Sequence, residues 1–184
     1  MRIRTFKTFP LVIVLLIAVT ATMTAQIASA RWEEIDTLHD RDRHDEVLQI
    51  LSELEPEAAS AADRAALLWR RARAEFSRAD LGLYAGELSE ETAMDRLQQI
   101  RETANAAVDA SRVESAGRAS ADGVPAQAYF WRGAARAKYG ELRGVLNALF
   151  MADDLREDLR LSTAADPMYG NPYYVAGQLY HLLP

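Results

Sequence analysis

The residues best suited to bind a metal ion lie in one short charged segment, from His39 to Asp45. This segment holds two histidines, His39 and His44, together with three aspartates, and imidazole and carboxylate groups are common ligands of divalent cations. A separation of five residues places the two histidines on different faces of a helix, and so dense a run of charge is typical of a turn. We therefore interpret the segment as a solvated turn between helices and expect no metal site.

The carboxylates do not form a pattern that suits acid–base catalysis. Neighbouring side chains on a helix point in different directions, and every acidic pair consists of sequence neighbours; the pairs are Glu33-Glu34, Glu90-Glu91 and Asp153-Asp154. The chain also lacks a phosphate-binding glycine loop, the G-x-S-x-G and H-E-x-x-H motifs, and any cysteine. We therefore expect a protein without enzymatic activity and without a cofactor.

Three arginines, Arg70, Arg71 and Arg73, form a basic cluster. Guanidinium groups match carboxylates in shape, so such a cluster is suited to hold an acidic ligand. The simpler interpretation, which we favour, is that these arginines pair with carboxylates such as Asp63 and Glu75 on the same helix or on a neighbouring one.

The first thirty residues have the layout of a signal peptide. Arg2, Arg4 and Lys7 give a basic start, an apolar stretch follows from Phe9 to Val19, and Ala28-Ser29-Ala30 has the small-x-small pattern of a cleavage site. The strongly apolar core is much shorter than the ~20 residues that a membrane-spanning helix needs. We expect cleavage of residues 1–30 and a mature domain of residues 31–184 in the periplasm of a Gram-negative cell. The alternative is an uncleaved N-terminal membrane anchor.

Composition excludes some partners and favours long helices. All 27 acidic residues lie after residue 30, whereas three of the 21 basic residues lie before it. The mature domain is therefore acidic and repels phosphate backbones, so we expect no binding to nucleic acid. Hydrophobic residues make up 49% of the chain, with 9 Gly and 6 Pro, which indicates a packed core and short loops.

Apolar residues recur with the period of a helix through most of the mature domain, as in Leu68, Ala72 and Phe76. No segment shows the alternation of a strand, and Ser111 to Pro125 has the composition of a linker. We expect seven helices: residues 32–38, a second helix that contains 47–54 and ends at Pro56, then 61–79, 89–110, 125–139, 141–165 and 172–182.

Helices of this length that are joined by short turns pair as antiparallel hairpins, and the hairpins repeat. The tetratricopeptide (TPR) pattern places a small residue four positions after a bulky one, and a glycine at the turn. Tyr129, Gly133 and the turn residue Gly140 fit, Tyr173, Gly177 and Tyr180 repeat the spacing, and Leu68, Ala72 and Phe76 fit loosely. Small residues at 72, 133 and 177 are expected to let helices approach closely. The sequence predicts an all-α fold in which antiparallel helical hairpins stack as a short TPR-like α-solenoid.

Several segments resemble known families. The segment LLWRRARA (67–74) is similar to a helix of the TPR-like regulators of microtubule dynamics. Four further segments resemble bacterial periplasmic TPR proteins, among them the T-component associated with TRAP transporters. These segments are AYFWRG (128–133), GVLNALF (144–150), DPMYG (166–170) and GQLY (177–180). The resemblance covers about residues 61–184 and implies a helical periplasmic homo-oligomer that works with a solute-binding protein. Two features depart from it: the lipoprotein cysteine is missing, and residues 172–182 are either a capping helix or half of a repeat.

In TPR hairpins the first helix lines the concave groove. The corresponding positions here are Trp69, Arg73, Gln127, Phe130, Ala134, Lys138, Tyr174, Gln178 and His181. Aromatic rings interleaved with cations suit an acidic peptide or an anionic amphiphile. The simpler alternative is that Trp69 and Phe130 belong to the core between repeats and that the cations are solvated.

These observations favour a binding scaffold for an exported protein partner. The resemblance to TRAP-associated proteins implies that one such partner is a solute-binding protein. The alternative is a carrier of a small hydrophobic or anionic ligand, with a pocket between the hairpins.

Overall fold

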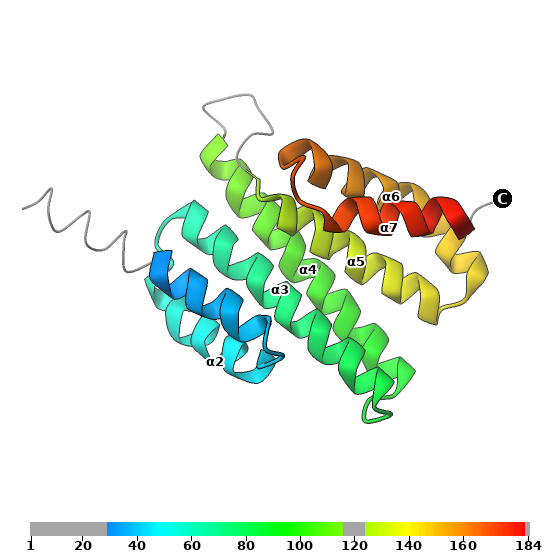
Figure 1. Cartoon of the computed structure of the whole chain (residues 1–184), viewed down its shortest axis with the longest axis horizontal. Coiled ribbons are helices and arrows are strands. Elements are labelled where there is room, and N and C mark those ends of the chain that lie inside the picture. The colour runs from blue at the N-terminus through cyan, green and yellow to red at the C-terminus, as the bar shows by residue number, and fades with distance from the viewer. Residues whose placement is uncertain (1–28, 116–123, 183–184) are drawn as a thin grey trace, which may run out of the picture. The chain divides into compact units, whose positions relative to one another are not determined.

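The computed structural model describes residues 29–115 and 124–182, which are almost entirely helical (Figure 1). A helix at 29–39 is followed by α2 (His44–Leu54), the short 3-10 helix η1 (Glu55–Glu57), α3 (Ala61–Tyr84), α4 (Glu90–Ser115), α5 (Ala126–Leu142), α6 (Val145–Ala165) and α7 (Asn171–Leu182). None of the described residues lies in a strand. The predicted all-α fold class is confirmed.

The contacts divide the chain into two units, Met1–Arg43 and His44–Pro184. In the first unit, the helix at 29–39 ends in a turn in which the Asp42 N–H donates to the His39 carbonyl over 3.0 Å. Asp42 has a φ of 58°, a left-handed conformation that aspartate tolerates better than most residues. The predicted signal peptide covers residues 1–30, most of which lie outside the described residues, so it stays a prediction.

The second unit is a stack of helical hairpins in sequence order (Figure 1). Helix α3 pairs with α4 and α5 pairs with α6, in each case through a short turn. The two hairpins stack because α4 packs along α5 and α3 also contacts α5. Helix α2 lies against α3, and α7 packs on α6. The predicted stack of antiparallel hairpins is therefore present.

Serine side chains cap the helices of the first hairpin. The Asp63 N–H donates to the Ser60 hydroxyl over 3.0 Å at the start of α3, and the Thr92 N–H donates to Ser89 over 3.2 Å at the start of α4. These bonds satisfy backbone donors that have no partner within the helix. Ser89, the first residue of the helix expected at 89–110, is thus the N-cap of α4.

Several predicted helix ends are wrong, and glycine explains two of them. Gly140 and Gly82 lie inside α5 and α3, whereas the turns use Gly144 with a φ of 91° and Gly86 with a φ of 72°. A helix interior tolerates glycine at a modest cost, while a positive φ nearly requires it. Helix α6 consequently begins at 145, not at 141. Helix α4 also continues to Ser115, into the predicted linker 111–125, of which 116–123 lie outside the described residues.

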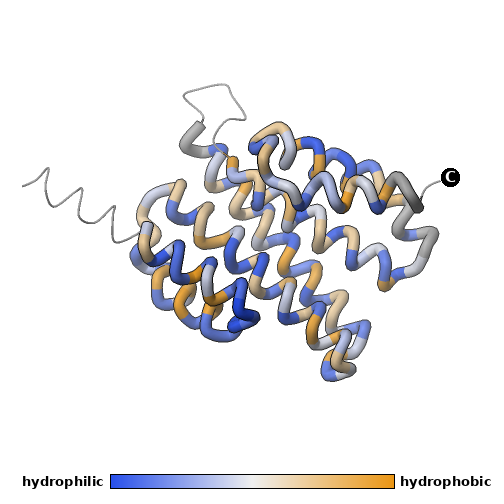
Figure 2. The backbone as a smooth tube through the Cα atoms, in the orientation of Figure 1, coloured by the Kyte–Doolittle hydropathy of each residue, from blue (hydrophilic) through white to orange (hydrophobic). Residues whose placement is uncertain are grey.

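The core is built where apolar stripes of successive helices meet (Figure 2). Two of the three predicted small residues mediate close packing. Ala72 is fully buried, and a Cβ atom added to Gly133 would lie 3.0 Å from the Asp158 Cβ. Gly177 does not share this role, because a Cβ there would meet nothing within 4 Å; its side of α7 faces no other described helix.

Candidate functional site

Four aromatic rings form a continuous row across the stacked hairpins. The Phe76 and Trp131 ring centroids are 5.5 Å apart, those of Trp131 and Phe130 are 5.0 Å apart, and those of Phe130 and Tyr169 are 5.6 Å apart. The last two contacts are edge-to-face, which is a favourable geometry for aromatic pairs. We call Phe76, Trp131, Phe130 and Tyr169 the aromatic row. It runs from α3 across α5 to the turn before α7.

The two central rings of the row, Phe130 and Trp131, are neighbours in the sequence but lie in different environments. Residues one apart on a helix point about 100° away from each other. Phe130 packs against Leu155 and Leu159 of α6 and is 6% exposed. Trp131 is half-buried and contacts three apolar clusters of the second unit. Trp131 therefore lies where the two hairpins and α7 come together.

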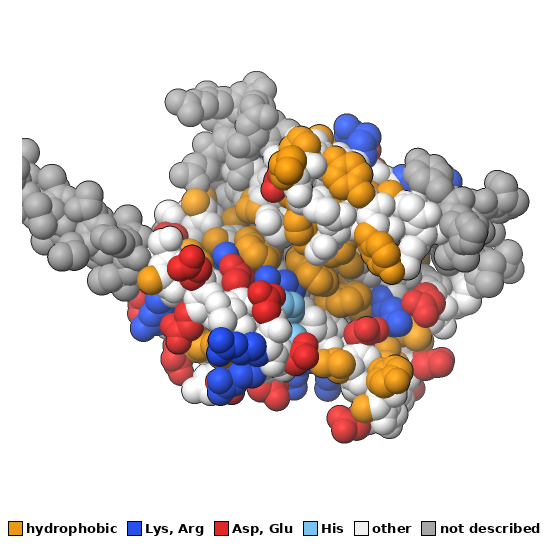
Figure 3. All heavy atoms as spheres, viewed as in Figure 1, with side chains coloured by type: hydrophobic (Ala, Val, Ile, Leu, Met, Phe, Trp, Pro, Cys, Tyr) orange, Lys and Arg blue, Asp and Glu red, His pale blue; other side chains and the backbone are white. Residues whose placement is uncertain are grey.

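Half-buried side chains follow one stripe of α5, with spacings of four, three and four residues: Gln127, Trp131, Ala134 and Lys138. Trp131 reaches Phe76 of α3, and the Lys138 Nζ lies 3.1 Å from Asp80 of α3, so this stripe borders α3. Hydrophobic side chains are visible in a hollow over α3 and α5, beside α7 (Figure 3). We call this surface the groove, defined by Arg73, Phe76, Trp131, Ala134, Lys138 and Tyr169.

Cations lie toward both ends of the groove. The guanidinium carbons of Arg70 and Arg73 lie 4.1 and 5.1 Å from the Trp69 ring centroid, within cation–π range. Burial raises the pKa of the Tyr169 hydroxyl, and the hydrogen bond from Asn171 and the charge of Arg73 lower it less. At the other end, burial lowers the pKa of Lys138, but hydrogen bonds and charge from Asp80 and Glu141 raise it above its ordinary value.

The indole nitrogen of Trp131 is a groove donor without a hydrogen-bond acceptor among the described residues. The Trp131 Nε1 atom is buried, and no described residue accepts a hydrogen bond from it. Buried donors in proteins almost always find an acceptor. Two other polar groups of this region are hydrogen-bonded: the Asn171 Nδ2 donates to the Tyr169 hydroxyl over 3.0 Å, and the Gln98 Nε2 donates to that of Tyr139 over 2.9 Å.

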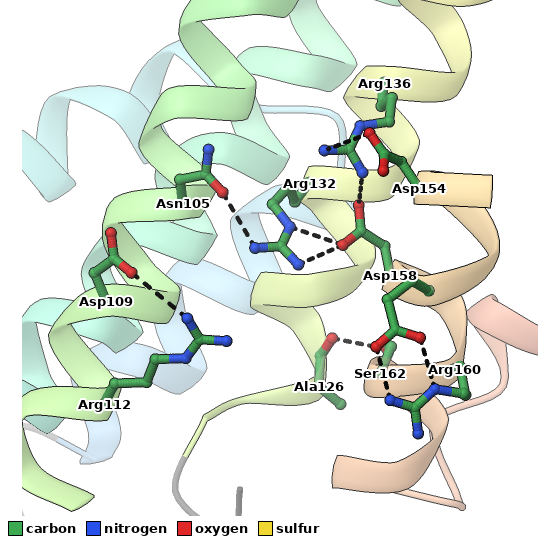
Figure 4. A network of polar contacts seen from close by, with 11 residues as sticks. Asn105, Asp109, Arg112, Ala126, Arg132, Arg136, Asp154, Asp158, Arg160 and Ser162 are labelled. Atoms are coloured by element: carbon green, nitrogen blue, oxygen red, sulfur yellow. Dashed lines mark hydrogen bonds and ion pairs between the residues drawn. The ribbon is translucent and has the colours of Figure 1, made fainter. Parts of the chain in front are cut away.

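A buried ion cluster lies behind the groove, between α5 and α6 (Figure 4). The Arg132 Nε donates to Asp158 over 2.8 Å and its Nη2 to the same oxygen, while the Arg136 Nη1 donates to the other oxygen over 2.7 Å. The Asp158 side chain is 2% exposed. Arg132 also donates to Asn105 of α4 over 3.2 Å, and Arg136 lies 3.6 Å from Asp154.

The ion cluster fixes how α5 meets α6. Burial raises the pKa of Asp158 more than hydrogen bonds and charge from Arg132 and charge from Arg136 lower it, as expected when desolvation offsets the attraction within a buried ion pair. The two arginines flank Gly133, whose missing side chain makes room for the Asp158 Cβ. Both carboxylate oxygens of Asp158 accept hydrogen bonds from arginines of α5. We therefore interpret the cluster as an internal link between the two helices of the hairpin.

The groove residues expected from the sequence are divided between core and surface. Trp69 is 7% exposed and packs among Ala107, Val108, Val124, Ala128 and Tyr129. Since Phe130 is equally buried, little of either ring is available to a ligand. Arg73, Gln127 and Lys138 are half-buried along α3 and α5. Tyr174 and Gln178 lie on the exposed side of α7, where the Gln178 Nε2 donates to the Tyr174 hydroxyl over 2.9 Å. The side chain of His181 lies outside the described residues.

Three residues of the groove, Trp131, Phe76 and Tyr169, are not among the groove positions that the TPR pattern predicts. A usable signal was the neighbouring pair Phe130-Trp131, since one helix face cannot hold both rings. Only one position of the predicted α5 stripe differs: the half-buried ring is Trp131, and Phe130 is buried. The Arg71 Nη2 pairs with Glu55 of η1 at 2.8 Å, as expected for a carboxylate on a neighbouring helix, whereas Asp63 bonds to Ser60.

Residues 29–115 and 124–182 contain no group of three or more metal-binding side chains, and none of their helices could cross a membrane. Comparisons of the chain with protein-family models, with curated proteins and with solved structures find no match.

Proposed function

We propose that this protein is an exported, non-catalytic binding scaffold that holds an extended segment of a partner protein along α3, α5 and α7. The observation that supports this proposal best is the aromatic row, which crosses successive hairpins and is bordered by the half-buried cations Arg73 and Lys138. Aromatic rings and arginine contribute most of the binding energy at protein interfaces.

The hairpin architecture suits a segment more than a compact ligand. Each hairpin presents its first helix on the same side, so the stack forms a surface that continues from one repeat to the next. The groove follows this direction: Arg73 lies on α3, Ala134 and Lys138 on α5, and Tyr169 before α7. An extended partner would contact all three elements at once.

The partner is an exported protein, on this proposal, because the first thirty residues have the layout of a signal peptide. The resemblance to TRAP-associated T-components makes a periplasmic solute-binding protein the first partner to test. That choice rests on short sequence segments, whereas the location of the binding surface rests on the aromatic row.

Site-specific photocrosslinking in the exporting cell tests this function. Leu81 is 50% exposed on α3 and lies eight residues after Arg73, on the same side of the helix. A photoreactive phenylalanine at Leu81 should crosslink one exported protein, identified by mass spectrometry. The matched control places the same group at Gln99, an exposed position of α4.

Equal crosslinking at both positions, or none at Leu81, would contradict the proposal. Native mass spectrometry of the protein purified from the periplasm adds a second criterion. A retained small molecule, in place of a protein, would instead support the alternative function of a carrier for a small hydrophobic or anionic ligand.

A further inference from the structure

We infer that the Trp131 indole N–H is the hydrogen-bond donor with which the groove recognises a backbone carbonyl of the bound segment. This inference rests on the proposed function and adds the chemistry of recognition: a neutral acceptor next to an apolar side chain. It also makes Trp131 the residue that determines which segments bind.

The first support is the unpaired donor itself. The Trp131 Nε1 is buried, and no described residue accepts from it. Leaving a buried donor without an acceptor destabilises a protein, so such atoms in native structures call for an explanation, and an acceptor that arrives with a ligand is one. Neither Trp69 nor Trp32 has a buried indole nitrogen that lacks an acceptor.

The second support is the position of the ring. Trp131 is half-buried in the stripe of α5 that borders α3, and it touches three apolar clusters of the second unit. The Phe76 ring beside it is tilted by 52° and is also half-buried. Because the Nε1 atom is buried, binding on this inference moves the Trp131 or Phe76 ring enough to expose the indole N–H.

The apolar surroundings decide which acceptor fits. The Phe76 and Phe130 rings flank the indole at centroid distances of 5.5 and 5.0 Å. Moving a carboxylate into such surroundings costs far more than moving an amide carbonyl. An extended segment presents a carbonyl at every residue, together with a side chain that can cover the aromatic row. The donor therefore selects a neutral segment with an apolar side chain at this point.

Indole N–H resonances test the inference directly. The chain has three tryptophans, so a nitrogen–proton correlation spectrum gives three indole signals, assigned with Trp131→Phe and Trp69→Phe. The first probe is N-acetyl-leucine-N-methylamide at millimolar concentration, and the second is decanoate. We expect the amide probe to shift the Trp131 indole proton in a saturable manner and to leave that of Trp69 in place.

Affinity for the partner that crosslinks at Leu81 gives the second measurement. A synthetic peptide that covers the crosslinked segment should bind Trp131→Phe about 2- to 10-fold more weakly, the loss expected for one neutral hydrogen bond. The variant Trp69→Phe should bind normally. Because the spectra are recorded on the unsubstituted protein, the test does not depend on the folding of Trp131→Phe.

Three outcomes would overturn the inference: an unmoved Trp131 signal, unchanged peptide affinity in Trp131→Phe, or a shift with decanoate alone. If the partner still crosslinks at Leu81, the proposed function stands and only the role of Trp131 fails. If crosslinking at Leu81 is absent, the proposed function fails as well.

Discussion

The two central hairpins have the same architecture but hold their helices together by different means. Between α3 and α4 the contact is made by small and aliphatic side chains, all at most 1% exposed: Ala72, Ala79, Leu97, Ile100 and Ala104. Between α5 and α6 the centre is an ion cluster in which Asp158 accepts from Arg132 and Arg136. One interface excludes water from apolar surface, and the other pairs charges under a glycine.

Because of this difference, the two interfaces should tolerate different amino-acid substitutions. Apolar contacts are non-directional, so an aliphatic interface accepts changes of shape that preserve volume. A buried ion cluster adds little net stability when intact, but removal of one member leaves the others charged and unpaired. We therefore expect the second hairpin to depend on a few individual atoms and the first to depend on total volume.

The largest effect is expected for Asp158→Ala. The substitution leaves two guanidinium groups, only 15% and 16% exposed, without their shared carboxylate. Loss of one member of a buried ion cluster costs about 3–5 kcal/mol, measured as the free energy of unfolding in urea. The control is Asp154→Ala, since Asp154 is 70% exposed and pairs with Arg136 at 3.6 Å; it should cost less than about 1 kcal/mol. Similar costs for the two variants would argue against a buried cluster.

The next largest effect is expected for Gly133→Leu. A side chain there would overlap the Asp158 Cβ at 3.0 Å and the Leu155 Cδ1 at 3.2 Å. Such overpacking should lower the free energy of unfolding by about 1–3 kcal/mol, as read from urea denaturation or from a lower Tm. Gly177→Leu is the matched control, because nothing lies within 4 Å of a Cβ at that position. That variant should be neutral or more stable, since leucine favours a helix interior over glycine.

The architecture could be predicted from the sequence because the apolar period, the serine cap at 89 and the short turns act locally. The exact turn residues could not be predicted from the sequence. Both Gly140 and Gly144 suit a helix end, and the choice of Gly144 depends on how far α5 must extend to pack along α4 and α6. Spacing alone does not contain that information, and the same holds for Gly82 and Gly86.

The groove could be predicted only in part, for a related reason. Lys138, Gln127 and Arg73 are half-buried, as long polar side chains at the edge of a helix interface often are, and their role in binding stays a prediction. The rings of Phe130 and Trp131 are both large and apolar, so composition cannot say which one faces α6. The ion cluster could not be predicted from the sequence, because Arg132 and Asp158 are 26 residues apart. The two residues come together only when α5 and α6 pack against each other.

A smaller effect is expected for a shape-preserving change at the apolar interface. Leu97 is 1% exposed between α3 and α4, and Leu97→Met keeps nearly the same volume. It should cost less than about 1.5 kcal/mol. The counterpart Asp158→Asn also preserves shape but removes the charge, so its cost should be clearly greater. Equal losses in urea denaturation would mean that both hairpins are held by volume alone.

The smallest effect is expected at the N-termini of α4 and α6, the second helices of the two hairpins, which begin in different ways. Ser89 caps α4 by accepting from the Thr92 N–H over 3.2 Å, whereas α6 follows Gly144, which makes no side-chain cap. Ser89→Ala removes the acceptor and should lower the free energy of unfolding by about 1 kcal/mol, while Ser89→Gly should cost only a few tenths. Amide hydrogen exchange should locate the loss in the first turn of α4 and leave α6 unchanged. Faster exchange at α6 in Ser89→Ala would show that the two hairpins unfold as one unit.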